Sequence, residues 1–237
     1  MNITVIYDNT ALRPDLASGW GFSVLVDDTV LFDTGCDGPG LIENLEKLGR
    51  SSAGLDAVVL SHNHGDHTGG LETVLGLKPG LPVHVCPDAG ADLEERIAAA
   101  GGRVVRTSPG MTIREGIRTT GSIPAAYKGT PMPEQALVLD TPSGTSVVTG
   151  CSHPGVGTIL EQASRISGST SFRMVLGGFH WRDFSPREAE REALCLERWN
   201  IGAIAPLHCS GEPARTALEK LRKDGIVHGG SGFGCTV

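Results

Sequence analysis

The sequence lacks any apolar run close to the roughly 20 residues that a membrane-spanning helix needs, so we expect no membrane partner. We also expect no signal peptide, because residues 2–7 have the pattern of a strand, without the charged and apolar regions of a leader. These two absences predict a cytoplasmic protein.

Strongly basic stretches are also absent, and the net charge of the 237 residues is −7. Binding to nucleic acid calls for clustered Lys and Arg that neutralise phosphates, so we expect no nucleic-acid partner. The six cysteines form no C-x-x-C pairs, which argues against a structural zinc knuckle. In a reducing compartment we expect them to be thiols, of which one or two are metal ligands.

The chain contains no linker, low-complexity segment or sustained repeat, and short strand-like runs alternate with helix-like runs. Strands are expected at residues 2–7, 22–26, 30–33, 56–60, 82–86, 136–140, 145–149, 173–177, 203–207 and 225–228. Helices are expected at residues 39–48, 68–76, 91–100, 155–167, 186–198 and 212–223, the fifth of them starting with a capping-box pattern. The first four or five strands are expected to meet in hairpins. The pattern predicts an α/β protein with mixed sheets covered by helices, in one domain spanning residues 1–237.

A cluster of histidines follows the strand expected at 56–60, in the sequence SHNHGDHTGG. Three imidazoles and a carboxylate are costly to pack together at a strand end unless a cation lies among them. These groups are good ligands for zinc, iron or manganese. His62 and His64 can point to one side of an extended segment, and a turn at Gly65 can bring Asp66 and His67 to a second position nearby. The cluster therefore predicts a metal site.

With its H-x-H-x-D-H pattern at residues 62–67, the sequence resembles the metallo-β-lactamase superfamily. The resemblance implies an αββα sandwich, in which two mixed β-sheets are flanked by helices and the metal site lies at one edge. It implies that the cluster supplies ligands to two metals. The first metal would be held by His62 and His64, and the second by Asp66 and His67.

The resemblance also points to positions outside the cluster. Asp33, in an early D-T-G, matches the acidic residue that orients a ligating imidazole in this family. His208 matches the last histidine of the family, a ligand of the second metal. Cys151 stands where a bridging Asp is expected, and no histidine occurs between residues 84 and 153 to supply the usual third motif. His153 is therefore expected to be a first-metal ligand.

Two of these positions have alternative roles. Cys151 either ligates a metal as a thiolate, which would favour zinc, or lies nearby as a small apolar filler. For His180 we favour a substrate-facing or ligand-supporting role over direct ligation, with a purely structural role as the alternative. Asp66 and His180 are the expected catalytic residues. One or two zinc ions are the expected cofactor, with iron and manganese as alternatives.

Further short motifs narrow the resemblance: Y-D-N at 7–9, G-W-G-F-S at 19–23, T-G-C-S-H-P-G at 149–155, G-G-F-H at 177–180 and H-C at 208–209. Together they look like the dihydropteroate-synthase-related branch of the superfamily. That branch includes archaeal enzymes that make 7,8-dihydropterin-6-yl-methyl-4-(β-D-ribofuranosyl)aminobenzene 5′-phosphate. Its members often carry an Arg after the I-P at 123–124; here Lys128 is the available point charge.

The resemblance implies a metal-dependent hydrolase or pterin-type transferase acting on a small molecule that is phosphorylated or pterin-like. Both reactions would use the same ligands and differ in the acceptor that reaches the site. The alternative from a different class is a non-enzymatic metal-binding or redox-sensing protein that uses Cys151 or Cys209.

Overall fold

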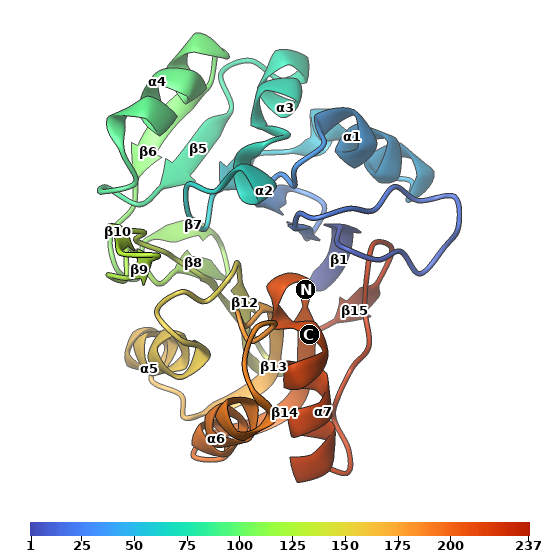
Figure 1. Ribbon diagram of the computed structural model, residues 1–237. Helices are drawn as coiled ribbons and strands as arrows, with labels where there is room; N and C mark the ends of the chain where they lie inside the picture. The colour runs from blue at the N-terminus through green and yellow to red at the C-terminus, as the bar shows by residue number, and fades with distance from the viewer. The chain divides into compact units, whose positions relative to one another are not determined.

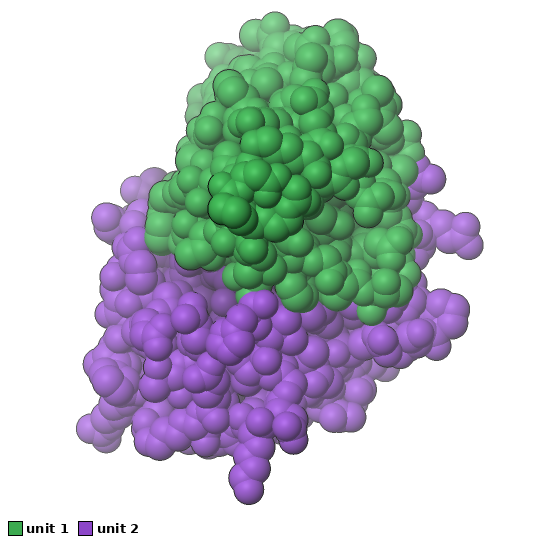
Figure 2. All heavy atoms as spheres, turned by 90° about the vertical axis from the view of Figure 1, so that its right-hand side faces the viewer, with its two compact units in different colours: residues 1–108, 229–236 green, residues 109–228, 237 purple.

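The computed structural model describes all 237 residues, and the chain forms two compact units, shown in separate colours in Figure 2. Unit 1 comprises residues 1–108 and 229–236, and unit 2 comprises residues 109–228 and 237. That both units act as one domain stays a prediction. Each unit is built on one mixed sheet with helices, as the sequence pattern predicts.

Unit 1 contains a seven-stranded sheet in the order β15-β1-β2-β3-β4-β5-β6. Its strands are β1 (Asn2–Tyr7), β2 (Ser23–Val26), β3 (Val30–Phe32), β4 (Ala57–Val59), β5 (Pro82–Val85), β6 (Arg103–Arg106) and β15 (Gly234–Thr236). Neighbours from β15 to β3 pair antiparallel, whereas β3 to β6 pair parallel. The expected hairpins beyond β3 are therefore wrong: helices connect these later strands, and such crossovers return the chain in the same direction.

Three helices of unit 1 pack on one face of this sheet: α1 (Gly38–Lys47), α3 (Leu71–Leu77) and α4 (Ala91–Ala99) (Figure 1). The unit also contains the one-turn helix α2 (Gly65–Thr68) and a short 3₁₀ turn, η1 (Ser52–Gly54). Leu41 and Leu45 of α1, Val74 of α3 and Ile97 of α4 are fully buried against strand residues such as Val58. Because these side chains recur every three or four residues, one face of each helix is apolar and covers the sheet.

Unit 2 contains a six-stranded sheet in the order β14-β13-β12-β11-β8-β7. Its strands are β7 (Thr112–Arg114), β8 (Ile117–Thr119), β11 (Leu137–Thr141), β12 (Gly144–Thr149), β13 (Ser171–Gly178) and β14 (Asn200–Leu207). Outside this sheet, the short strand β9 (Ala126–Tyr127) pairs with β10 (Thr130–Pro131). Strands β12, β13 and β14 run parallel, and the others antiparallel. The carboxyl ends of the three parallel strands therefore lie at one edge of the sheet.

Three helices cover one face of the unit 2 sheet: α5 (Val156–Ser167), α6 (Pro186–Leu196) and α7 (Gly211–Leu221) (Figure 1). A 3₁₀ turn, η2 (His208–Ser210), precedes α7. The predicted capping box of α6 is confirmed, since the Ser185 side chain accepts from the Glu188 backbone and the Glu188 side chain accepts from the Ser185 backbone. None of the helices in the protein combines the length and hydrophobicity that crossing a bilayer requires.

Three local predictions are wrong. The expected strand at 225–228 is only an isolated bridge between Ile204 and Ile226. The expected helix at 68–76 is interrupted at Gly69 and Gly70, where the chain passes against the backbone of the turn after β3. Strands β6 to β10 and β15 are missing from the prediction because they are short or, like β6, end in charged residues.

Candidate metal centre

The histidine cluster of unit 1 follows β4 and forms the start of α2. His64 is the N-cap residue with an extended backbone, and its carbonyl accepts the backbone N–H groups of His67 and Thr68 at 3.0 Å each. The short helix α2 is tied to the turn after β3, since the Thr34 N–H donates to the His67 carbonyl at 2.7 Å. These backbone hydrogen bonds therefore fix the positions of the Cα atoms from which the imidazole side chains extend.

A hydrogen-bond network around Asp33 assigns the tautomers of two histidines, His62 through Ser61 and His67 directly. The Ser61 hydroxyl donates to Asp33 Oδ2 at 2.7 Å and so accepts from His62 Nδ1 at 2.8 Å. His67 Nδ1 donates to the same Asp33 Oδ2 at 2.7 Å. Both rings are therefore protonated on Nδ1 and present an Nε2 lone pair. A metal-binding histidine is commonly oriented in this way by a carboxylate on its other nitrogen.

The arrangement of these rings fits a metal ion. His62 Nε2 lies 3.0 Å from His64 Nδ1, and the ring centroids of His62 and His67 are 4.2 Å apart. Two nitrogen ligands of one tetrahedral ion stand about 3.3 Å apart when each bond is about 2 Å. The Asp66 carboxylate reaches within 3.9 Å of His67 Nε2, and 18% of its side chain is exposed. Unit 1 thus brings together all four residues predicted from the H-x-H-x-D-H pattern.

Asp33 occupies the supporting position that the sequence predicts. Its side chain is fully buried, and it also accepts the Ser61 backbone N–H at 2.7 Å. The residue has a φ of 58°, a left-handed backbone that is uncommon outside glycine. Such a conformation turns the carboxylate at the end of β3 toward the start of the histidine cluster.

In unit 2, the predicted residues lie at the ends of the three parallel strands. Cys151 and His153 follow β12, His180 follows β13, and His208 with Cys209 follows β14. The donor atoms of Cys151, His153 and His180 lie within 4.8 Å of one another. Those of Cys151, His208 and Cys209 do so as well. Unit 2 therefore brings its predicted residues into one cluster around Cys151.

Glu134 is the functional residue that sequence reasoning missed. Its fully buried carboxylate accepts the backbone N–H groups of Cys151, Ser152 and His153 at 2.7–2.8 Å, and also His153 Nδ1 at 2.9 Å. This contact leaves the lone pair of His153 on Nε2, as Asp33 does for the histidines of unit 1. No motif surrounds Glu134 in the sequence, so only its position in the structure identifies it.

Cys209 and Tyr127 complete the surroundings of this cluster. Burial raises the pKa of the Cys209 thiol, but hydrogen bonds with the Cys151 and His180 side chains and the charge of His180 outweigh it, and the pKa lies below its usual value. The Tyr127 ring packs against the rings of His153 and His180, with centroids 5.4 and 5.6 Å away. Lys128 lies over the same Tyr127 ring at 5.0 Å.

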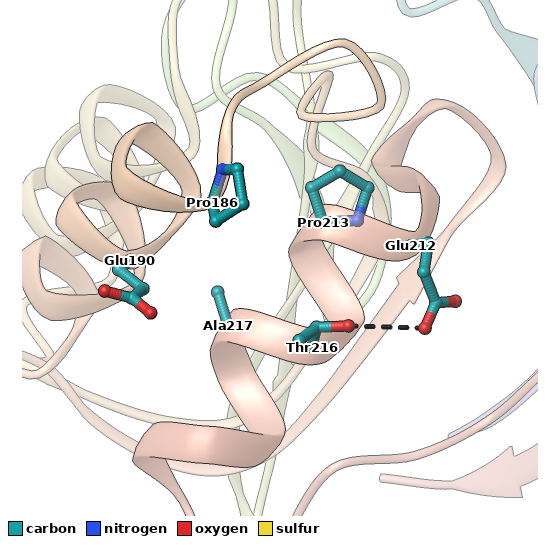
Figure 3. A pocket seen from close by; sticks show the side chains of 6 residues that line it. All are labelled: Pro186, Glu190, Glu212, Pro213, Thr216 and Ala217. Atoms are coloured by element: carbon teal, nitrogen blue, oxygen red, sulfur yellow. Dashed lines mark hydrogen bonds between the residues drawn. The ribbon is translucent and has the colours of Figure 1, made fainter.

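Unit 2 also contains a hollow of about 230 Å³ between α6 and α7 (Figure 3). Its lining is Pro186, Glu190, Glu212, Pro213, Thr216 and Ala217. Its two carboxylates have partners, since Glu190 pairs with Lys220 at 2.6 Å and Glu212 accepts from Thr216 at 3.2 Å. With no imidazole or thiol among its lining residues, this hollow offers none of the donors gathered at the strand ends.

Comparison with known proteins identifies the family. The sequence profile described as the metallo-beta-lactamase superfamily matches residues 21–194, which include the histidine cluster, Cys151, His153 and His180. The chain belongs to this superfamily, and the predicted α/β fold with two mixed sheets flanked by helices is confirmed.

Two relatives place it more narrowly. A protein of Methanocaldococcus jannaschii named 7,8-dihydropterin-6-methyl-4-(beta-D-ribofuranosyl)-aminobenzene-5'-phosphate synthase is 27% identical, over 82% of this chain and 80% of its own. Tm1679, described as a metal-dependent hydrolase of the beta-lactamase superfamily, is 29% identical to this chain, and its crystal structure matches with a TM-score of 0.83, covering 100% of this chain and 99% of that one. The predicted resemblance to the pterin-related branch is confirmed.

Proposed function

We propose that the protein is a metal-dependent enzyme that acts on a small molecule, as a hydrolase or a pterin-type transferase. The observation that carries the proposal is the pair of histidines, His62 and His67, whose Nδ1 atoms are held through Asp33, so that each ring would bind a metal through Nε2. This is the arrangement expected of metal ligands, and it has no evident structural purpose deep in unit 1.

Each unit has its own set of proposed metal ligands. Those of unit 1 are His62, His64, Asp66 and His67, and those of unit 2 are Cys151, His153 and His208. This donor set of imidazoles with a carboxylate and a thiol suits zinc, with iron and manganese as alternatives. One or two such ions, when bound, would act as a Lewis acid toward the substrate and the attacking group.

The residues of the chain itself supply orientation and proton transfer. Asp33 and Glu134 fix the rings of His67 and His153 through their Nδ1 atoms. The Asp66 carboxylate is partly exposed and its Oδ2 lies 3.9 Å from His67 Nε2, so we assign it to hold or release a proton at Oδ2. A positioned carboxylate of this kind contributes about 10²–10⁴-fold to rate.

The surroundings of the unit 2 cluster favour a planar, anionic substrate. Tyr127 places an aromatic ring beside His153 and His180, and Lys128 holds a positive charge 5.0 Å from the centroid of that ring. Stacking of a pterin or aryl ring on Tyr127 and attraction of a phosphate by Lys128 would use both features. The likeness to the pterin synthase agrees with this substrate class.

Turnover assays on the zinc-loaded protein test the proposal. The substrates are a 6-methyl-dihydropterin diphosphate with and without an arylamine phosphate, together with a phosphodiester, a lactone and a thioester. We expect turnover of at least one, abolished by a chelator and lowered about 100-fold or more in kcat/KM by Asp66→Asn. The exposed Asp15→Asn is the matched control and should keep the parent rate. Turnover that survives removal of the metal would refute the proposal.

A redox-sensing protein is the second candidate, favoured by the closeness of two thiols. The sulfur atoms of Cys151 and Cys209 lie within 4.8 Å of each other, and both side chains are buried. A reversible loss of two thiols with metal release after mild oxidation, in a protein that turns over none of the substrates above, would support this candidate instead.

A further inference from the structure

Three residues with a left-handed backbone stand at the ends of neighbouring strands in unit 2. Ser152 follows β12 with a φ of 62°, His180 follows β13 with 60°, and His208 follows β14 with 49°. Each such residue costs on the order of 1–3 kcal/mol, and these conformations cluster at functional sites. Ser152 lies between Cys151 and His153, and His180 is itself one of the three, so the donors Cys151, His153 and His180 lie in or next to this left-handed backbone at the strand ends.

The donor atoms of this trio are spaced for a single ion. The Cys151 sulfur and one nitrogen from each of His153 and His180 lie within 4.8 Å of one another. The two rings are 4.6 Å apart between centroids and tilted by 53°. In a tetrahedral site with bonds of about 2.0–2.3 Å, the ligand atoms stand roughly 3.3–3.8 Å apart. Small changes in side-chain torsions would therefore close the three donors around one cation.

The hydrogen bonding of the His153 and His180 imidazoles also favours a shared metal ion. Glu134 accepts from His153 Nδ1 and so leaves a lone pair on Nε2. His180 Nδ1 is buried and has no hydrogen-bond partner. A buried polar atom without a partner costs about 1–3 kcal/mol, and a metal ion would remove that cost. If His180 only faced a substrate, nothing would require its Nδ1 atom to be buried near the Cys151 thiol.

We infer that His180 is a metal ligand, which shares one soft divalent ion with Cys151 and His153 within unit 2. The sequence favours a substrate-facing His180, and the geometry assigns it to the metal instead. One thiolate and two imidazoles select zinc, cobalt or cadmium over magnesium or calcium. The inference rests on the proposed function only in that the chain binds metal; it requires no particular reaction.

Cobalt titration of the full-length chain tests the assignment. The parent for the titration carries His62→Asn and His64→Asn, so that the histidines of unit 1 do not dominate the signal. We expect a near-ultraviolet thiolate-to-cobalt charge-transfer band that saturates at about one equivalent. Cys151→Ser should remove the band, and His180→Gln should weaken cobalt binding by about tenfold or more. The surface variants Cys195→Ser and His228→Gln are the matched controls and should change neither.

The circular dichroism of each metal-free variant shows whether it folds, and the same band is recorded in the chain with His62 and His64 intact as a second reading. The inference is overturned if His180→Gln binds cobalt as tightly as its parent with an unchanged band, or if the band survives Cys151→Ser. Loss of turnover in His180→Gln with unchanged cobalt binding would make His180 a catalytic residue, and would leave the proposed function standing. A chain that binds no transition metal with all of its histidines intact would contradict both.

Discussion

Glu134 is the single side chain that holds most of the unit 2 cluster in place. Its carboxylate is surrounded by four N–H donors, three from the backbone of residues 151–153 and one from the ring of His153. A buried carboxylate with this many donors is well compensated, so it can serve as a rigid anchor. Both the position of the loop and the tautomer of His153 depend on it.

Replacing Glu134 by Gln should weaken metal binding by about 10–100-fold, because the amide keeps the size of the side chain but no longer accepts reliably from His153 Nδ1. Competition with a chromophoric chelator measures the affinity. The matched control is Glu161→Gln on the exposed face of α5, which should keep the parent affinity. Equal affinities for both variants, each folded, would show that Glu134 is not an orienting residue.

The residues of the candidate metal centre differ in whether they can be identified from the sequence. His62, His64, Asp66 and His67 can be identified because four donors within six positions have few structural explanations. Glu134 cannot, because its partners lie 17 to 19 positions away in the chain and no pattern links them. Donors that are contiguous in sequence are therefore predictable, while those brought together by folding are not.

At the scale of elements, the link between α2 and α3 is defined by close backbone contact. A Cβ on Gly70 would lie well inside contact distance of the Thr34 carbonyl oxygen, although the φ of −88° suits any residue. Gly76, within α3, has nothing within 4 Å of the same position. Alanine substitutions at the two glycines therefore distinguish the cost of a steric clash from the effect of helix propensity.

Gly70→Ala should destabilise the protein by about 1–3 kcal/mol, because the added methyl must push apart two backbone segments. Gly76→Ala should instead stabilise it by about 0.4–1 kcal/mol, since alanine restricts the unfolded chain and favours the helix. Urea unfolding of both variants measures the difference. Similar effects in both would mean that the turn after β3 does not need the close approach at Gly70.

His84 on β5 should make stability depend on pH. Burial, followed by the nearby charge of Arg103, lowers the pKa of His84 to about 4. The unfolded chain, with a histidine pKa near 6.5, then binds more protons than the folded one between about pH 6.5 and 4. The contribution of His84 to the free energy of unfolding is therefore largest above pH 6.5, and on the order of 1–3 kcal/mol of it, after allowing for solvent screening, is lost as the pH falls to 4.

His84→Gln should flatten that dependence in urea unfolding at pH 7.5 and 4.5, measured with a chelator present so that metal release does not contribute. The control is His228→Gln, whose side chain is 63% exposed and should leave the dependence as in the parent. If His84→Gln loses as much stability on acidification as the parent does, another group is responsible.

The elements are well predicted where periodicity is strong. The helices at α1, α4, α5, α6 and α7 lie within two residues of their expected bounds, because an apolar face recurs along each of them. The pairing of β3 with β4 is not predictable from their own residues, since an apolar strand of three or four residues looks the same in a hairpin and in a parallel pair. Only the intervening helix α1 indicates a crossover.

At the scale of the whole molecule, the two units have similar architectures. Each unit has a mixed sheet with parallel strands on one side, and each places its imidazoles immediately after a strand. Unit 1 is completed by residues 229–236, which follow unit 2 in the chain. The resemblance to the superfamily is readable from the sequence because the histidine cluster is contiguous, whereas the substrate is not, because the residues around it come from distant segments such as Tyr127 and His180.

The metal content of the purified protein tests the central claim most directly. Elemental analysis of the chain should find about one equivalent or more of a transition metal, and a lower content in the His62→Asn, His64→Asn double variant. The surface variant His228→Gln should hold as much metal as the parent. A content well below one equivalent that does not fall further when His62 and His64 are replaced would contradict the account.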